Sequence, residues 1–207
     1  MEIKNVIFDL GNVIVDLNIP KSDAAFREMV GIGFSDATAT DLGTFRDYEI
    51  GKISEARFLN YFIKRADHTI QALDIINAWN AMLVEIPWQR LQMMKSLMER
   101  YRTFILSNTN ETHLRWVGQY LKIHYDLNSL DSFVHSAYYS HKMGCRKPDR
   151  EIYETLLRTE GLNPSETIFF DDNESNILAA EEQGLNVVLV DSEDEIIDLV
   201  PRYIEFR

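Results

Sequence analysis

The chain has 207 residues, of which 21 are Lys or Arg and 33 are Asp or Glu, so its formal net charge at pH 7 is -12. This acidity argues against a protein that holds nucleic acid or an anionic membrane through a general positive field. A hydrophobic fraction of 45% and a charged fraction of 26% are typical of a folded chain, and the length allows one domain or one domain with an insertion.

Cysteine content and hydropathy bear on the compartment. Cys145 is the only cysteine in the sequence, so no intramolecular disulfide can form. The apolar run that ends at Asp9 is too short for a signal peptide, and no apolar stretch approaches the roughly 20 residues of a membrane span. We therefore expect a cytoplasmic protein with no membrane or nucleic-acid partner, and the sequence leaves its oligomeric state open.

Compact apolar runs rich in β-branched and aromatic residues predict five buried strands. They lie at Asn5–Asp9, Thr103–Ser107, Phe133–Tyr138, Thr167–Asp171 and Asn186–Val190. Helical patterns fill the later intervals, at Glu111–Lys122, Asp149–Glu160, Glu174–Gln183 and Glu193–Tyr203. Continuously apolar strands that alternate with helices predict an α/β fold, a doubly wound parallel sheet with helices on both faces.

About ninety residues separate the first two strands, far more than a crossover requires. Helical periodicity recurs in this interval, at Ala24–Val30, Ser54–Arg65 and Ala72–Leu83. Pro20 and Ser54 are plausible helix starts, and Gly31 and Gly51 plausible breaks. We predict a discontinuous α/β core at residues 1–15 and 91–207 and an all-helical insertion at residues 16–90, which returns to the sheet through a helix at Pro87–Arg100.

Polar residues follow the predicted strands at the edge where open parallel sheets bind ligands. Asp9 ends the first strand, Ser107 the second and Asp171-Asp172 the fourth, and Lys147 precedes a helix between them. Carboxylates without His or Cys nearby suit a hard cation, and Mg2+ prefers one or two carboxylates with waters and a substrate phosphate. Asp9 would then attack phosphorus, with Lys147 and the Ser107 hydroxyl on the phosphoryl oxygens. The five histidines show no ligand spacing and are expected to be structural or surface residues.

In these motifs the chain resembles the haloacid dehalogenase-like hydrolase superfamily. The motifs are Asp9 in FDLGNV, Ser107 in LSNTN, Lys147 in RKPD and Asp171-Asp172 in FFDDNESN. The resemblance spans nearly the whole chain, and in detail it is to the small sugar-phosphate phosphatases of the superfamily. It implies a Rossmann-like core and identifies the helical insertion with the cap domain of the family.

The resemblance also implies a role for each motif. Asp9 would be the nucleophile that forms an aspartyl-phosphate, Ser107 and Asn108 would bind the phosphoryl group, and Lys147 would balance the charge of nucleophile and phosphate. The implied Mg2+ site comprises Asp9, the backbone carbonyl of Gly11 and an acid of the last motif. Asp172 is the first choice for that direct ligand and Asp171 the second. Asn176 would lie in the outer coordination shell.

Gly11 departs from the family pattern, because most family phosphatases have there a second Asp that protonates the leaving oxygen and later activates water. One hypothesis is an acidic leaving group, such as the anomeric hydroxyl of a sugar 1-phosphate. Another is that water or a cap residue replaces the acid, with Glu49, Asp47 and Asp16 as candidates. Phe45 and Arg46, in the same part of the insertion, are the expected substrate-specificity residues.

The sequence thus predicts a Mg2+-dependent phosphatase that acts on a small phosphorylated metabolite, such as a hexose 1-phosphate, through an aspartyl-phosphate. A metal-independent 2-haloacid dehalogenase also lacks the second Asp, but the paired acids Asp171-Asp172 favour a metal site and hence the phosphatase. Gly11 alone motivates a third hypothesis, in which the protein is a catalytically weak phosphate-binding or regulatory module.

Overall fold

The computed structural model describes residues 2–191 and 195–205. At its centre is a five-stranded sheet in the order β5-β4-β1-β6-β7, in which all neighbouring strands are parallel. The strands are β1 (Asn5–Phe8), β4 (Arg102–Ser107), β5 (Ser136–Tyr139), β6 (Thr167–Asp171) and β7 (Asn186–Leu189). This order and direction confirm the predicted doubly wound α/β fold.

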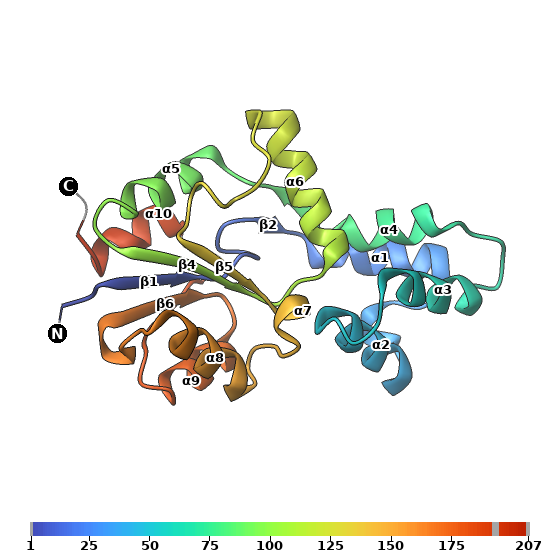
Figure 1. Ribbon diagram of the computed structural model, residues 1–207. Coiled ribbons are helices and arrows are strands. Elements are labelled where there is room, and N and C mark those ends of the chain that lie inside the picture. Colours follow the sequence, from blue (N-terminus) through green and yellow to red (C-terminus); the bar gives the residue numbers. More distant parts are fainter. Residues whose placement is uncertain (1, 192–194, 206–207) are drawn as a thin grey trace.

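Successive side chains of β1 show how the sheet is covered on both faces. Val6 and Phe8 pack into a cluster with α5 (Trp88–Leu97), α6 (Glu111–Tyr125) and α10 (Ile196–Leu199). Ile7 packs on the opposite face, in a cluster with α8 (Arg150–Glu160) and α9 (Glu174–Glu181). Figure 1 shows these two layers of helices on either side of the strands. Burial on both faces explains why the strands are continuously apolar in sequence.

Two of the differences from the predicted bounds have a clear physical cause. Phe133 and Val134 are buried in the loop before β5, so the apolar run there reflects burial and not strand pairing. Of the predicted helix Glu193–Tyr203, Glu193 and Asp194 lie outside the described residues. Ile196–Leu199 forms α10 and Val200–Arg202 a short 3-10 helix, because Pro201 interrupts the helical pattern.

The long interval between the first two sheet strands folds into four helices beyond the carboxyl ends of the strands (Figure 1). They are α1 (Ile19–Val30), α2 (Ala39–Glu49), α3 (Glu55–Arg65) and α4 (Ala72–Asn80), with a 3-10 turn at Phe34–Asp36. As predicted, Gly31 ends α1 in a left-handed conformation and Ser54 caps α3. Among the described residues, no helix has the length and apolar character needed to cross a membrane.

This inserted region is not all-helical, which corrects one detail of the prediction. The short strands β2 (Asp16–Leu17) and β3 (Leu83–Glu85) pair antiparallel where the chain enters and leaves it. The division of the chain at residues 16 and 90 stays a prediction.

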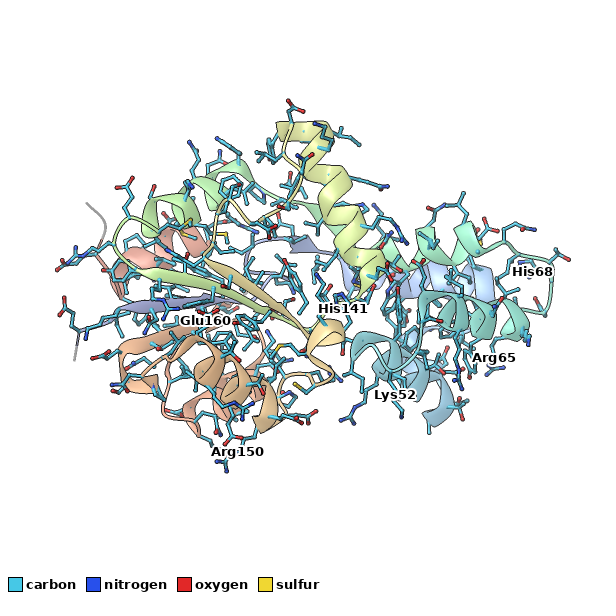
Figure 2. All side chains as sticks on the ribbon, in the orientation of Figure 1. Lys52, Arg65, His68, His141, Arg150 and Glu160 are labelled. Atoms are coloured by element: carbon cyan, nitrogen blue, oxygen red, sulfur yellow. The ribbon has the colours of Figure 1, made fainter. Side chains whose placement is uncertain are left out.

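The inserted region has its own core, which we call the aromatic cluster. Its members are Phe26, Phe34, Phe45, Phe58, Phe62 and Trp79. The Phe45 ring stacks on Phe62 with the ring centroids 4.8 Å apart and on Trp79 at 5.1 Å. Figure 2 shows the side chains of the inserted region, with Lys52, Arg65 and His68 labelled, beside those that surround the sheet. The inserted helices therefore hold one another largely without the sheet.

Candidate active site

A buried lysine lies between two carboxylates at the carboxyl edge of the sheet. The Lys147 ammonium is 2.8 Å from Asp9 Oδ1 and 2.6 Å from Asp171 Oδ2, and its side chain is only 1% exposed. Asp9 follows β1 directly, and its backbone N–H donates to the Phe170 carbonyl of β6 at 2.8 Å. Parallel pairing of β1 with β6 thus brings together the first and last motifs of the sequence.

For both Lys147 and Asp9, burial and ion pairing shift the pKa in opposite directions. Burial lowers the pKa of Lys147, but the carboxylates of Asp9 and Asp171 outweigh it and hold the pKa above its ordinary value. Burial raises the pKa of Asp9 to about 7, with Lys147 opposing the rise and Asp171 adding to it. Burial and Asp171 thus oppose the ionised form of Asp9, and Lys147 supports it.

Both oxygens of Asp171 are occupied by donors from the protein. Oδ1 accepts from the Asn173 backbone N–H at 2.8 Å and from Asn176 Nδ2 at 2.9 Å, and Oδ2 accepts from Lys147 Nζ. Asp171 is also fully buried. It is therefore placed to fix the Lys147 ammonium, and its oxygens have little capacity left to coordinate a metal ion.

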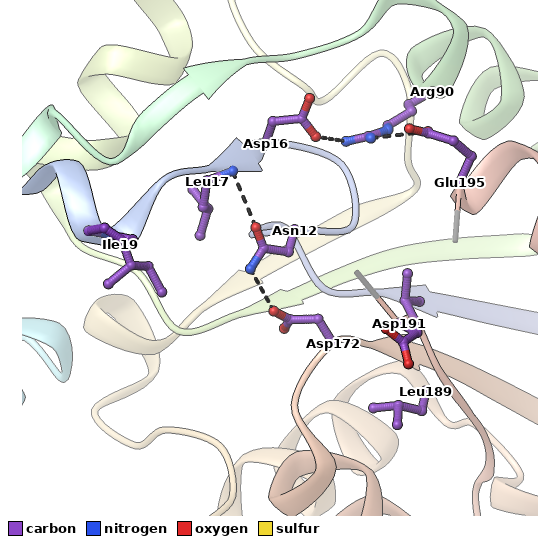
Figure 3. Close-up of a pocket in the computed structure, with 11 residues that line it drawn as sticks. Asn12, Asp16, Leu17, Ile19, Arg90, Asp172, Leu189, Asp191 and Glu195 are labelled. Carbon is purple, nitrogen blue, oxygen red and sulfur yellow. Dashed lines mark hydrogen bonds and ion pairs between the residues drawn. The ribbon is translucent and has the colours of Figure 1, made fainter. Parts of the chain in front are cut away.

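Asp172 is held by Asn12, a residue that is not among those predicted to form the site. Its Oδ2 accepts from Asn12 Nδ2 at 2.8 Å, and Asn12 Oδ1 accepts from the Leu17 backbone N–H at 3.2 Å (Figure 3). Asn12 has a φ of 52°, a left-handed conformation that Asn tolerates better than most residues. Asp172 is more exposed than Asp9 and Asp171, so it keeps lone pairs for a ligand.

The three carboxylates have the chemistry of a Mg2+ site. One oxygen from each of Asp9, Asp171 and Asp172 lies within 4.8 Å of the other two. Asp9 Oδ1 is buried, and apart from its ion-pair contact with Lys147 it accepts no hydrogen bond from the described residues. Carboxylate oxygens with spare lone pairs suit a hard divalent cation. These donors therefore fit Mg2+, with Asp9 and Asp172 the least occupied.

Asn108 fixes the loop that carries the lysine. Its Nδ2 donates to the Lys147 carbonyl at 2.8 Å, and its Oδ1 accepts from the Lys147 backbone N–H at 2.8 Å. These two bonds join the end of β4 to the segment before α8. The Asn108 amide group is thereby committed to the protein, and its contact with a substrate stays a prediction.

A cavity of about 230 Å³ lies between this edge of the sheet and the inserted helices, and we call it the inner cavity. From the sheet side it is lined by Gly11, Asn108 and Ser107, the last residue of β4. From the inserted side it is lined by Leu17, Ile19, Glu49, Trp79, Met82 and Leu83. The predicted phosphoryl-binding serine thus faces a chamber that suits a small metabolite.

A second cavity of about 650 Å³, the outer cavity, approaches the site from the side of Asn12 (Figure 3). Four acidic residues line it: Asp16, Asp172, Asp191 and Glu195. Its basic residue, Arg90, already pairs with Asp16 at 2.6 Å and with Glu195 at 3.1 Å. Excess negative charge repels phosphate esters, so the inner cavity suits a phosphorylated ligand better.

Gly11 lies close to the wall of the inner cavity. A Cβ there would lie 2.7 Å from Leu17 Cδ1, the end of a flexible side chain that can shift. An acid at this position therefore requires Leu17 to move. The predicted contact of the Gly11 carbonyl with a metal stays a prediction.

The two predicted specificity residues lie in different surroundings. Phe45 packs within the aromatic cluster against Trp79. Arg46 is exposed and pairs with Asp149 at 3.4 Å. Neither is among the described residues that line the inner cavity. The contacts of Phe45 are therefore packing contacts and that of Arg46 is a surface ion pair. Contact of either residue with substrate stays a prediction.

The three candidates for a replacement acid also lie in different surroundings. Asp16 lies in the outer cavity with Arg90, and Asp47 pairs with Lys52 at 3.1 Å. Of the three, Glu49 lines the inner cavity.

His113 is a further inner-cavity residue, and the structural role expected for the histidines stays a prediction. Its ring stacks on Trp79 with the centroids 4.9 Å apart, and Nε2 lies 3.2 Å from the Trp79 carbonyl. Burial lowers the pKa of His113 to about 4, so the ring is neutral at pH 7. No ligand spacing pointed to this position, because its place in the wall depends on tertiary packing.

Comparison with known proteins finds relatives across most of the chain. Residues 3–184 match the family of haloacid dehalogenase-like hydrolases. The chain is 30% identical over 187 residues to the D-ribitol-5-phosphate phosphatase of Bacteroides thetaiotaomicron, a match that covers 88% of this chain and 89% of the relative.

Solved structures resemble both the sheet and the inserted region. A haloacid dehalogenase family enzyme of Bacteroides thetaiotaomicron, crystallised with magnesium and inorganic phosphate, gives a TM-score of 0.84 at 30% identity, covering 95% of this chain and 98% of that one. A hydrolase of the same kind from Porphyromonas gingivalis gives 0.90 at 28% identity, with 100% of both chains covered.

Proposed function

This chain belongs to the haloacid dehalogenase-like hydrolase family, and from that premise we propose that it is a Mg2+-dependent phosphatase of a small phosphorylated sugar or polyol. The observation that carries the proposal is the buried Lys147 between Asp9 and Asp171, with Asp172 beside them. The relative that is 30% identical is named for phosphate removal from ribitol 5-phosphate.

Asp9 is the proposed nucleophile. One carboxylate oxygen attacks phosphorus, the bond from phosphorus to the ester oxygen of the substrate breaks, and an aspartyl-phosphate forms, which water then cleaves to phosphate. Lys147 balances the charge of Asp9 and the phosphoryl group, and Asp171 keeps the ammonium directed at them. Ser107, at the wall of the inner cavity, donates its hydroxyl proton to a phosphoryl oxygen.

Asp9, Asp172 and the backbone carbonyl of Gly11 are the proposed Mg2+ ligands. When bound, the metal supplies positive charge that neutralises the phosphoryl oxygens. Asp172 is preferred to Asp171 because the protein already occupies both oxygens of Asp171. The related enzyme crystallised with magnesium and phosphate supports the choice of metal.

The absence of an acid at Gly11 bears on which sugar phosphate reacts best. A leaving oxygen of low basicity needs less help from an acid, which favours a hexose 1-phosphate. Ribitol 5-phosphate, the named substrate of the relative, has a primary alcohol as its leaving group. Initial rates of hydrolysis of glucose 1-phosphate and ribitol 5-phosphate test this preference. A rate on ribitol 5-phosphate that equals or exceeds the rate on glucose 1-phosphate would contradict the choice of a hexose 1-phosphate as substrate.

The reaction class is tested with sugar phosphates, nucleotides and 2-haloacids, each with Mg2+ and with EDTA. We expect phosphate release that requires Mg2+ and that falls on the order of 10⁴-fold or more in Asp9→Asn. The matched control is Asp47→Asn, which makes the same change at the Lys52 pair. Metal-free halide release would indicate the dehalogenase instead, and saturable binding without turnover would indicate a binding module.

A further inference from the structure

The inserted region presents an apolar wall to the inner cavity with one polar exception. Among the described lining residues the apolar members of this wall are Leu17, Ile19, Trp79, Met82 and Leu83, and the exception is Glu49. The Glu49 side chain keeps 25% of its surface exposed. Hydroxyl groups that leave water for an apolar wall lose hydrogen bonds, so a hydroxylated ligand needs a partner there.

Glu49 is held in place through both its backbone and its side chain. As the last residue of α2, it accepts a hydrogen bond at its carbonyl from Ser140 Oγ at 2.6 Å. Its Oε2 lies 2.7 Å from Arg146 Nε, and Arg146 directly precedes Lys147. Arg146 Nε makes this ion pair without a hydrogen bond, so the Glu49 carboxylate keeps capacity to accept one.

The backbone beyond α2 fixes the same junction. Gly51 has a φ of 69°, and a Cβ there would lie 2.1 Å from the His141 carbonyl oxygen. His141 belongs to α7 (Ser140–Met143), which lies between the sheet and the inserted helices in Figure 2. The end of α2 therefore sits against the core at a defined distance, which sets the position of the Glu49 carboxylate.

Two other polar side chains of the inner cavity, Asn108 and His113, already have partners within the protein. The Asn108 amide bonds the Lys147 backbone in both directions. In His113, Nε2 faces the Trp79 carbonyl and Nδ1 faces Asn110 Nδ2 at 3.3 Å. The Glu49 carboxylate is the charged acceptor among the described residues of the cavity lining.

We propose that Glu49 is a specificity residue that accepts hydrogen bonds from hydroxyl groups of the substrate, with Arg146 as its positioning residue. This inference rests on the proposed phosphatase function and names the substrate class, monophosphates whose non-phosphate part carries hydroxyls within reach of the end of α2. Because Glu49 comes from the inserted region and Ser107 from the sheet, one substrate would contact both.

Two five-carbon monoesters with primary leaving groups test the proposal, ribitol 5-phosphate and pentyl phosphate. We expect Glu49→Met to lower the ratio of their kcat/KM values by roughly 10- to 100-fold, the range of a hydrogen bond to a charged group. Glu49→Gln, which keeps an acceptor, should lose less. Asp47→Asn removes a carboxylate two residues earlier on α2 and should leave the ratio unchanged.

Proton transfer is the rival role for Glu49, because burial raises the pKa of its carboxyl against the pull of Arg146, Lys147 and Arg46. p-Nitrophenyl phosphate separates the two roles, since its leaving group needs no proton. Equal losses of Glu49→Met on ribitol 5-phosphate and pentyl phosphate, with none on p-nitrophenyl phosphate, would make Glu49 the proton donor and overturn the proposal.

The same assays show whether the fold or the proposed reaction has failed instead. Equal losses on all three esters together with a lower Tm would give Glu49 a structural role and overturn the proposal. A wild-type enzyme that hydrolyses none of the three esters contradicts the phosphatase function itself. A wild-type enzyme that hydrolyses ribitol 5-phosphate and pentyl phosphate with equal kcat/KM contradicts the role of Glu49 alone.

Discussion

The sheet edge and the inserted helices meet at the inner cavity, but different forces stabilise them. The edge is a group of buried charges, Asp9, Lys147 and Asp171, in which each charge depends on another. The inserted region is built on the aromatic cluster, whose rings contact one another. We therefore expect the edge to be sensitive to the loss of one charge and the inserted region to the loss of volume.

Lys147→Met should have the largest effect, because it leaves two buried carboxylates without their shared cation. Breaking a buried ion pair costs about 3–5 kcal/mol of unfolding free energy, and loss of one group that stabilises the transition state costs roughly 10²- to 10³-fold in kcat. Urea unfolding and phosphate release measure the two effects. Lys142→Met, at an exposed position on α7, is the control. Wild-type stability in Lys147→Met would contradict the charge network.

Phe62→Ala tests the inserted region. The Phe62 side chain is fully buried and its ring lies 4.8 to 5.2 Å from three other phenylalanine rings. We expect a loss of about 3–5 kcal/mol, measured by urea unfolding, because the cavity left behind cannot collapse completely. Leu73→Ala, at a side chain that is largely exposed on α4, should cost far less. Equal costs for the two variants would show that the aromatic cluster is not the core of this region.

Asp41 is the exception within the inserted region, a buried charge in an otherwise apolar setting. Burial raises its pKa, but hydrogen bonds from Thr38, Tyr61 and Arg65 outweigh it and hold the pKa well below its ordinary value. A depressed folded-state pKa contributes stability above about pH 4, and that contribution is lost as the pH falls further.

Asp41→Asn should therefore cost about 1–3 kcal/mol at pH 7, the value of hydrogen bonds to a charged group. Chemical unfolding at pH 7, 5 and 3 measures the difference between wild type and variant. We expect this difference to shrink below pH 4. A difference that is constant down to pH 3 would show that the carboxylate charge contributes nothing.

Asn12→Gly should have the smallest effect and tests the support of Asp172. Glycine keeps the left-handed backbone while removing the amide that holds the Asp172 carboxylate. Loss of a partner behind a metal ligand weakens metal affinity by roughly 10- to 100-fold, which titration of activity with Mg2+ measures. Asp126→Gly, at the other described non-glycine residue with positive φ, is the matched control. An unchanged Mg2+ requirement in Asn12→Gly would show that the Asn12 amide does not support the metal site.

The sequence predicts the sheet edge better than the inserted region because the edge depends on local signals. Each buried strand is an apolar run, and Asp9, Ser107 and Asp171 lie at strand ends that parallel pairing brings together. The supporting contacts are less accessible, since Asn12 reaches Asp172 and Asn108 reaches the Lys147 backbone across the fold. Nothing near these asparagines in sequence indicates their partners.

Helix α2 shows why the inserted region is harder to predict. The all-helical prediction covers Ala39–Glu49 without giving this helix bounds of its own, because apolar periodicity is weak there: Asp41 is buried and Leu42 is about half exposed. The available signal was the capping box, in which Thr38 and Asp41 bond each other's backbone N–H groups. Phe45, an expected specificity residue on this helix, packs in the aromatic cluster because the other inserted helices surround it.

Phosphoryl transfer to Asp9 is the central claim, and chemical trapping tests it most directly. Borohydride reduces an aspartyl-phosphate to homoserine, so enzyme quenched during turnover with Mg2+ and a sugar phosphate should show homoserine at position 9 by peptide mass spectrometry. The same treatment without Mg2+, or of Asp9→Asn, should show none. A burst of released alcohol equal to the enzyme concentration, with Asp9 unmodified, would contradict the claim.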